Sequence, residues 1–112
     1  MRFTKDTSKV LACIYKLYLE KRKNGQTRKE AAFFAANFWR GVDALSSYPE
    51  DDIKASIHEL KVAGFVESYT SGSFEIKEDL IKQMENRFQD GASGVAKYLL
   101  DLAANIVSGL SF

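Results

Sequence analysis

Residues 53–66 read Ile-Lys-Ala-Ser-Ile-His-Glu-Leu-Lys-Val-Ala-Gly-Phe-Val, and this stretch decides how the rest of the chain is interpreted. Its large apolar residues recur at helical spacing, which predicts a helix that runs to about Ala63. Gly64 stands where helices commonly end in a left-handed glycine, and the apolar residues after it are typical of a strand. The stripe expected to face the core consists of Ile53, Ile57 and Leu60.

The residues before this helix carry the signals of a helix start. Residues 47–50, Ser-Tyr-Pro-Glu, have the spacing of a capping box, and Pro49 is tolerated in a first helical turn. The helix dipole favours acidic side chains in that turn, so the carboxylates there need no catalytic role. They belong to Glu50, Asp51 and Asp52.

The residues after it predict a hairpin and a further helix. Residues 65–69 and 73–76 have the pattern of two short strands around the turn Thr70-Ser71-Gly72. Because an isolated hairpin is only marginally stable, this one must pack on the helices. Residues 77–88 carry apolar side chains at helical steps and predict a fourth helix, which Asp90-Gly91 interrupts.

Two helices are expected in the first part of the chain. Thr7 and Ser8 can cap a first helix that runs to about Lys23, where Asn24-Gly25 ends it. The tetrapeptide Thr27-Arg28-Lys29-Glu30 fits a capping box and starts the second helix.

The apolar stripe of this second helix either continues through Gly41 or breaks near it and resumes. Phe33 and Trp39 lie off the stripe, so they need a second surface to pack on. The stripe consists of Ala31, Phe34, Ala35, Phe38, Val42 and Leu45.

The last segment, residues 93–110, is the most apolar and predicts a C-terminal helix. More than half of its circumference is apolar or small, whereas a surface helix usually needs an apolar arc of only about 100°. The excess predicts burial between layers or a homodimer. The residues expected at a dimer interface are Leu99, Leu102, Ile106 and Leu110.

The composition indicates one globular domain without enzymatic chemistry. A chain of 112 residues with 46% hydrophobic and 28% charged residues is typical of a single folded domain. Cys13 and His58 each occur alone, which excludes an intramolecular disulfide, a cysteine zinc site and multi-histidine metal sites. No nucleophile–base pair, phosphate-cradling glycine loop or metal-ligand spacing is visible. We therefore expect no catalytic residues, no cofactor and no metal.

The chain is expected to be cytoplasmic and to have no membrane partner. No apolar run approaches the roughly 20 residues that a membrane span needs. Residues 10–15 are too short to be the apolar core of a signal peptide, since Lys16 follows at once. A lone cysteine also fits an intracellular protein.

The formal net charge of +1 arises because a basic first part of the chain and an acidic second part nearly cancel. Residues 1–40 hold ten Lys or Arg and three Asp or Glu, which gives +7, and residues 41–112 hold six and twelve, which gives −6. Such asymmetry favours an anionic partner on one part of the fold.

The predicted order of elements resembles the winged helix-turn-helix superfamily, especially small bacterial and phage regulators with a C-terminal dimerisation helix. The pattern Ile53-x3-Ile57-x2-Leu60-x3-Gly64-Phe65-Val66 is similar to the third helix of that superfamily turning into the first strand of the wing, and residues 74–76 fit the return strand. The resemblance covers residues 7–88. It implies a single α+β, mainly helical domain over residues 1–112, with three helices, a two-stranded wing and two C-terminal helices.

In this superfamily the third helix enters the major groove, and the start of the second helix contacts the DNA backbone. The resemblance implies phosphate docking by Lys21, Arg22, Lys23, Arg28 and Lys29, and a position near the major groove for Lys54, Ser56, His58 and Lys61. The predicted third helix contains no Arg, Asn or Gln, which make bidentate base contacts, and residues 70–73 contain no Lys or Arg. Positioning on DNA is therefore expected more than base reading.

Two classes of function stay open. The chain is interpreted first as a homodimer that binds duplex DNA and regulates transcription or serves as a mobile-element or phage accessory factor. The alternative is a winged-helix module that binds a protein partner through Ala55, Val62 and the acidic face of the third helix. Salt-dependent DNA binding supports the first class. A co-purifying protein that is lost on charge reversal at Asp51 and Glu59 supports the second.

Overall fold

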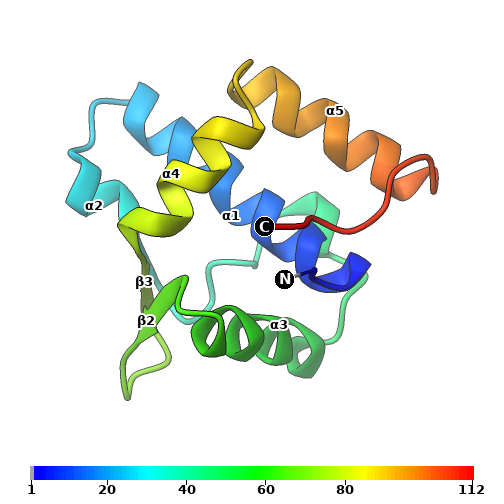
Figure 1. The fold of residues 1–112 in the computed structure, drawn as a ribbon. Coiled ribbons are helices and arrows are strands. Elements are labelled where there is room, and N and C mark those ends of the chain that lie inside the picture. Colours follow the sequence, from blue (N-terminus) through cyan, green and yellow to red (C-terminus); the bar gives the residue numbers. More distant parts are fainter. Residues whose placement is uncertain (1) are drawn as a thin grey trace.

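A computed structural model of the chain describes residues 2–112 and has an α+β, mainly helical fold with a small antiparallel sheet (Figure 1). The elements of this range are α1 (Lys5–Lys23), α2 (Arg28–Ala32), β1 (Phe33–Phe34), the short 3-10 helix η1 (Asp43–Leu45), α3 (Glu50–Val62), β2 (Val66–Ser68), β3 (Phe74–Ile76), α4 (Glu78–Arg87) and α5 (Ala92–Ala103).

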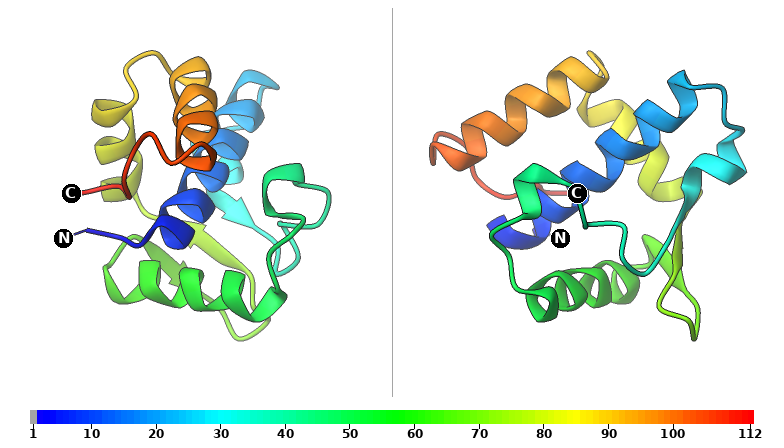
Figure 2. Two further views of the ribbon diagram at one scale, coloured as in Figure 1. Left: turned by 90° about the vertical axis from the view of Figure 1, so that its right-hand side faces the viewer. Right: turned by 180° about the vertical axis from the view of Figure 1, so that it is seen from behind.

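Helix α1 is the central element of the core. It packs against α3 on one side and against α5 on the other, and both helices can be followed around it in Figures 1 and 2. Val10, Leu11 and Ile14 have no exposed surface. Since α1 is covered on both sides, it fixes the position of α3 relative to the rest of the molecule.

Helix α1 begins earlier than the sequence predicted. Thr4 is the N-cap, and its side chain accepts a hydrogen bond from the Thr7 backbone N–H. The predicted caps Thr7 and Ser8 lie inside the helix and are buried. Their hydroxyls bond distant segments instead, since Ser8 Oγ accepts from the backbone N–H of Leu110 at 2.7 Å. The predicted end of the helix is confirmed, because Asn24 is its C-cap.

The second helix is much shorter than predicted. The capping box between Thr27 and Glu30 is confirmed, but α2 ends at Ala32 and the chain continues as β1 and a series of turns. The ring of Phe34 stacks on that of Phe74, with centroids 5.3 Å apart and an interplanar angle of 8°. Pairing with β3 therefore overrides the helical periodicity of this segment.

The predicted hairpin is confirmed, and β1 adds a strand that was not predicted. The strand order is β1-β3-β2, with Phe34 opposite Phe74 and Val66 opposite Ile76. A two-residue strand inside a helical pattern gives no periodic signal of its own, so only the tertiary pairing reveals it.

Helix α3 has the predicted end but a different start. Its N-cap is Pro49, without a side-chain cap, so the predicted capping box that begins at Ser47 is wrong. Gly64 has the left-handed φ of 83° expected at the C-terminal end. Ile53 and Leu60 are buried, as predicted, and Ile57 is half-buried.

The C-terminal part forms two helices and a returning tail. The helix predicted over residues 77–88 is confirmed as α4, but α5 ends at Ala103, short of the predicted residue 110. The remaining residues run back to the N-terminus, where the Phe3 N–H donates to the Leu110 carbonyl at 2.9 Å. The two ends of the chain therefore lie side by side (Figure 2). Burial of Leu110 in this pairing explains why the apolar run does not continue as helix.

The predicted dimer stripe on the last helix is not formed. Leu102 and Leu110 are buried within the same chain, and Leu99 is partly covered by the core. Ile106 remains 71% exposed, beyond the end of α5, and Leu100 is 72% exposed. The apolar excess of this segment therefore mainly packs inside the chain.

Within residues 2–112, no helix combines the length and the apolar content that a membrane crossing requires.

Candidate functional site

The basic residues between the end of α1 and the start of α2 form one group, which we call the α1–α2 basic group: Lys21, Arg22, Lys23, Arg28 and Lys29. Lys21 Nζ donates to the Phe33 carbonyl at 2.7 Å and lies 3.7 Å from the centroid of the Phe34 ring. Partial burial lowers the pKa of this amine. Lys21 therefore holds β1 against α1, and its amine is not free to contact a phosphate.

Two arginines of this group also make contacts within the chain. Arg22 donates to the Gln26 carbonyl at 3.0 Å, and the Arg28 guanidinium lies 3.9 Å from the Glu78 carboxylate. Lys23 and Lys29 are exposed and have no ion-pair partner within residues 2–112. The group is thus less available to a ligand than its sequence implied.

A second group, the α3 basic group, consists of Lys54, His58 and Lys61. At 100° per residue these three positions fall within an arc of about 60° of the helix. All three are exposed, and Lys54 pairs with Glu50 at 3.4 Å. The side chain of Lys61 has neither a hydrogen-bond nor an ion-pair partner in the part of the chain that the structure describes.

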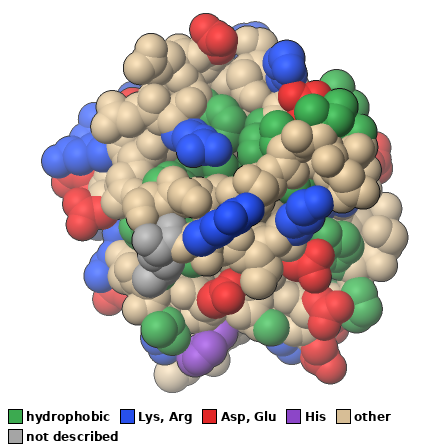
Figure 3. Space-filling view, turned by 45° about the vertical axis from the view of Figure 1, so that its right-hand side comes forward, with side chains coloured by type: hydrophobic (Ala, Val, Ile, Leu, Met, Phe, Trp, Pro, Cys, Tyr) green, Lys and Arg blue, Asp and Glu red, His purple; other side chains and the backbone are tan. Residues whose placement is uncertain are grey.

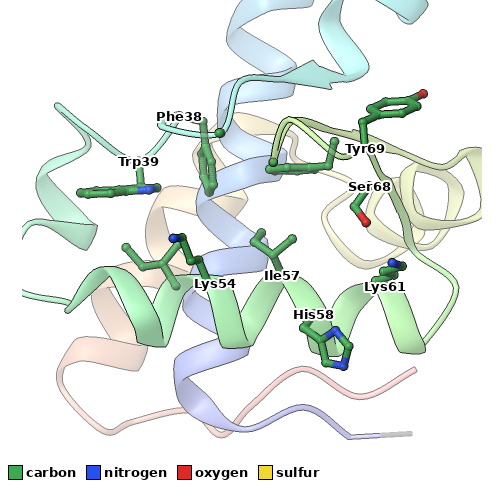
Figure 4. Close-up of a pocket in the computed structure, with 12 residues that line it drawn as sticks. Phe38, Trp39, Lys54, Ile57, His58, Lys61, Ser68 and Tyr69 are labelled. Carbon is green, nitrogen blue, oxygen red and sulfur yellow. The ribbon is translucent and has the colours of Figure 1, made fainter.

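The α3 basic group borders a hollow of about 260 Å³ between α3 and the hairpin (Figure 4). Lys54, Ile57 and Lys61 extend toward the opposite wall, whereas His58 lies at the outer edge and points away from the aromatic side chains. No Asp or Glu is among the described lining residues. The described residues that line the hollow are Ala36, Phe38, Trp39, Ile53, Lys54, Ile57, His58, Lys61, Ser68, Tyr69, Gly72 and Phe74.

The aromatic wall of the hollow is held in place by neighbouring rings. The Phe38 ring packs edge-on against Phe34 and Phe74, with centroids 5.8 and 5.3 Å away. On the hairpin, the Tyr69 hydroxyl donates to the Glu75 carboxylate at 2.8 Å, and this hydrogen bond raises the pKa of Tyr69. These contacts keep the Phe38 and Tyr69 rings in defined positions, and the Arg40 guanidinium lies 5.5 Å from the centroid of the Trp39 ring.

The opposite flank of α3 has a different character. Ser56, predicted near the major groove, is buried, and Thr7 Oγ1 lies 3.2 Å from its hydroxyl oxygen. Thr7 also hydrogen-bonds the Glu59 carboxylate. This flank fastens α3 to α1 and borders an acidic hollow that includes Asp6, Asp52 and Glu59, so Ser56 is not a candidate DNA contact.

The two basic groups do not form one surface. In Figures 1 and 2, α2 and the end of α1 lie above the sheet, and α3 lies at the opposite end of the molecule. Figure 3 shows a face on which basic and acidic side chains alternate, with the one histidine, His58, at its lower edge. The charge asymmetry of the sequence therefore does not become a single basic face in this view.

Sequence reasoning did not assign Phe38, Trp39 or Tyr69 to a site. Trp39 gave the only signal, because it lies off the expected helical stripe and needs a second surface. The hollow supplies that surface.

No protein-family model, curated protein or solved structure matches the chain. Its function is therefore inferred from its own residues.

Proposed function

We propose that the chain is a winged-helix protein that binds duplex DNA with α3 and the β2–β3 hairpin. The observation that carries this proposal is the α3 basic group, which lies on an exposed face beside the hairpin. In the winged-helix arrangement the helix before the hairpin enters the major groove, and the hairpin is the wing. The strand order β1-β3-β2 supports this assignment of α3 and the hairpin.

The charge of α3 indicates which face would meet DNA. Asp52 and Glu59 lie about 130–150° around the helix from the centre of the α3 basic group, and Glu59 is hydrogen-bonded to Thr7. The basic face can thus approach phosphates while these two carboxylates point elsewhere. Because the helix also carries Glu50 and Asp51, we expect modest affinity that depends strongly on salt.

The test is a fluorescence-anisotropy titration of a mixed-sequence duplex at several salt concentrations. Replacing both lysines of the α3 basic group, Lys54→Gln with Lys61→Gln, should weaken binding on all sequences and reduce the salt slope by about 2, or about 1 for each phosphate contact. The matched control, Arg28→Gln with Lys29→Gln, removes the same charge far from α3 and should change the slope less.

Either of two results contradicts the proposal. One is the absence of a complex at tens of micromolar protein in low salt, since that is above ordinary non-specific affinity. The other is a larger loss of affinity in the Arg28 and Lys29 control than in the α3 variant, which would move the DNA surface to the α1–α2 basic group.

A second candidate function is binding of a basic protein partner. Val62 is 74% exposed at the rim of the acidic hollow beside Asp52 and Glu59, and an exposed apolar side chain within an acidic surface suits a basic partner. A partner whose binding is lost in Asp52→Lys and is unaffected by DNA would favour this function.

The homodimer and a role in regulating transcription stay predictions. With Leu102 and Leu110 buried, a dimer would have to use exposed residues such as Leu100 and Ile106. Light scattering at tens of micromolar protein decides between monomer and dimer.

A further inference from the structure

We propose that the hollow between α3 and the hairpin binds a small aromatic carboxylate, with its ring against Trp39 and its carboxylate at Lys61. The walls of the hollow are preformed, its open end carries an unpaired cation, and its lining holds no acidic residue. This site would take such a ligand whether or not α3 binds DNA.

The inner part of the hollow suits a flat apolar group. Its floor consists of apolar side chains from α3 and β3, namely Ile53, Ile57 and Phe74. Phe38 and Trp39 form the wall above α3 (Figure 4). Because Phe38 is packed edge-on between other rings, its part of the wall needs little rearrangement when an aromatic ring enters.

The outer part suits an anion. The Ser68 hydroxyl points toward the end of α3 that carries Lys61, and an ammonium and a hydroxyl can both donate to a carboxylate (Figure 4). Lys54, at the Trp39 end, is already paired with Glu50. Of the two lysines that line the hollow, Lys61 is therefore the one without an ion pair among the described residues.

The dimensions limit the ligand to one or two fused rings. A volume of about 260 Å³ is below the usual range of drug-sized sites, which begins at about 300 Å³. The seven helical steps from Lys54 to Lys61 span about 10 Å along the helix axis, so the hollow is elongated. A two-ring carboxylate such as 2-naphthoate matches this shape and charge.

The experiment is isothermal titration of the full chain with 2-naphthoate, in the absence of DNA. We expect a dissociation constant of about 1 mM or below, as for a small ligand in a preformed apolar site. The neutral isostere 2-naphthamide should bind about tenfold more weakly, because it lacks the charge-assisted contact with Lys61.

Variants locate the binding site. Lys61→Gln should weaken 2-naphthoate binding about five- to tenfold and leave 2-naphthamide unchanged. Trp39→Leu should weaken both probes, since it removes the flat wall. Lys77→Gln is the matched control: Lys77 is exposed and outside the lining, so its loss should change neither affinity.

The proposal is overturned if wild-type protein shows no binding of 2-naphthoate up to about 10 mM, roughly ten times the expected dissociation constant. It is also overturned if both probes bind equally, or if Lys61→Gln binds 2-naphthoate as wild type does. If Trp39→Leu does not fold, the proposal is still tested by the comparison of the two probes and by the variant of the exposed Lys61. Since no DNA is present, the outcome is independent of the DNA titration.

Discussion

The α1–α2 basic group and the α3 basic group contain the same kinds of side chain but differ in the contacts that these side chains make. In the α1–α2 basic group, Lys21 and Arg22 donate to backbone carbonyls, and Arg28 pairs with Glu78. In the α3 basic group, Lys61 has no partner within residues 2–112 and faces a hollow. The first group holds more basic residues, and most of its contacts are made within the chain, whereas the second group places an unpaired lysine side chain beside a hollow. Charge density along a sequence therefore does not locate a binding surface by itself.

The largest expected effect concerns the hairpin wall beside the α3 basic group. Gly72 has a φ of +90°, and a Cβ there would lie 3.1 Å from the Ala36 Cβ. Gly72→Ala should lower the free energy of unfolding by about 1–2 kcal/mol. An alanine is strained in this left-handed backbone conformation, and its Cβ crowds Ala36. Urea denaturation measures this. Thr70→Ala, on the same exposed turn, is the control, and an equal loss there would argue against a special role for Gly72.

A smaller effect tests the contrast between Lys21 and Lys61 directly. Lys21→Met should lower the free energy of unfolding by about 1 kcal/mol, because it removes the hydrogen bond to Phe33 and the contact with the Phe34 ring. Lys61→Met should stay within about 0.5 kcal/mol of wild type, as exposed substitutions usually do. If thermal or urea unfolding showed equal losses of stability in the two variants, Lys21 would contribute no more to the fold than Lys61.

The smallest expected effect concerns the capping box between Thr27 and Glu30, at the start of the helix that carries Arg28 and Lys29. Hydrogen bonds from Thr27 hold the pKa of Glu30 below its ordinary value of 4.5. A carboxyl with a lowered pKa in the folded state contributes stability that is present above pH 4.5 and is lost as the pH falls through the folded-state pKa. Thr27→Ala should move the pKa of Glu30 toward 4.5 in an NMR titration.

An unchanged Glu30 pKa in that variant would mean that the Thr27 hydroxyl does not help to lower it, and that the Thr27 backbone N–H alone is responsible. Gln26→Ala is the control, because the hydrogen bonds described for Gln26 use only its backbone: its carbonyl accepts from Arg22, and its N–H donates to the Lys21 carbonyl.

The sequence predicted the parts of the fold that depend on local signals. The periodicity of Ile53 and Leu60, the left-handed Gly64 and the capping box at Thr27 all act over a few residues, and all are confirmed. The helix expected through Phe34 and Phe38 failed because stacking on Phe74, forty residues after Phe34, outweighs local helical preference.

The candidate site was predictable only in part. The resemblance implied a position near the major groove for Lys54, His58 and Lys61, and in the structure these three residues line one hollow. Ser56 was wrongly included, because its burial depends on Thr7, a residue 49 positions away. The aromatic wall could not be predicted, since residues 36–39 take their place from contacts with the hairpin and not from a regular pattern.

The bond between Ser8 and Leu110 joins residues 102 positions apart and has a consequence for the order of folding. The first turn of α1 receives this partner only after almost the whole chain has been synthesised. Contacts of such long separation slow folding, since a large loop must close before they form. During synthesis on the ribosome, α1 is made before α3 and α5 but would complete its packing only after residue 110 has been added.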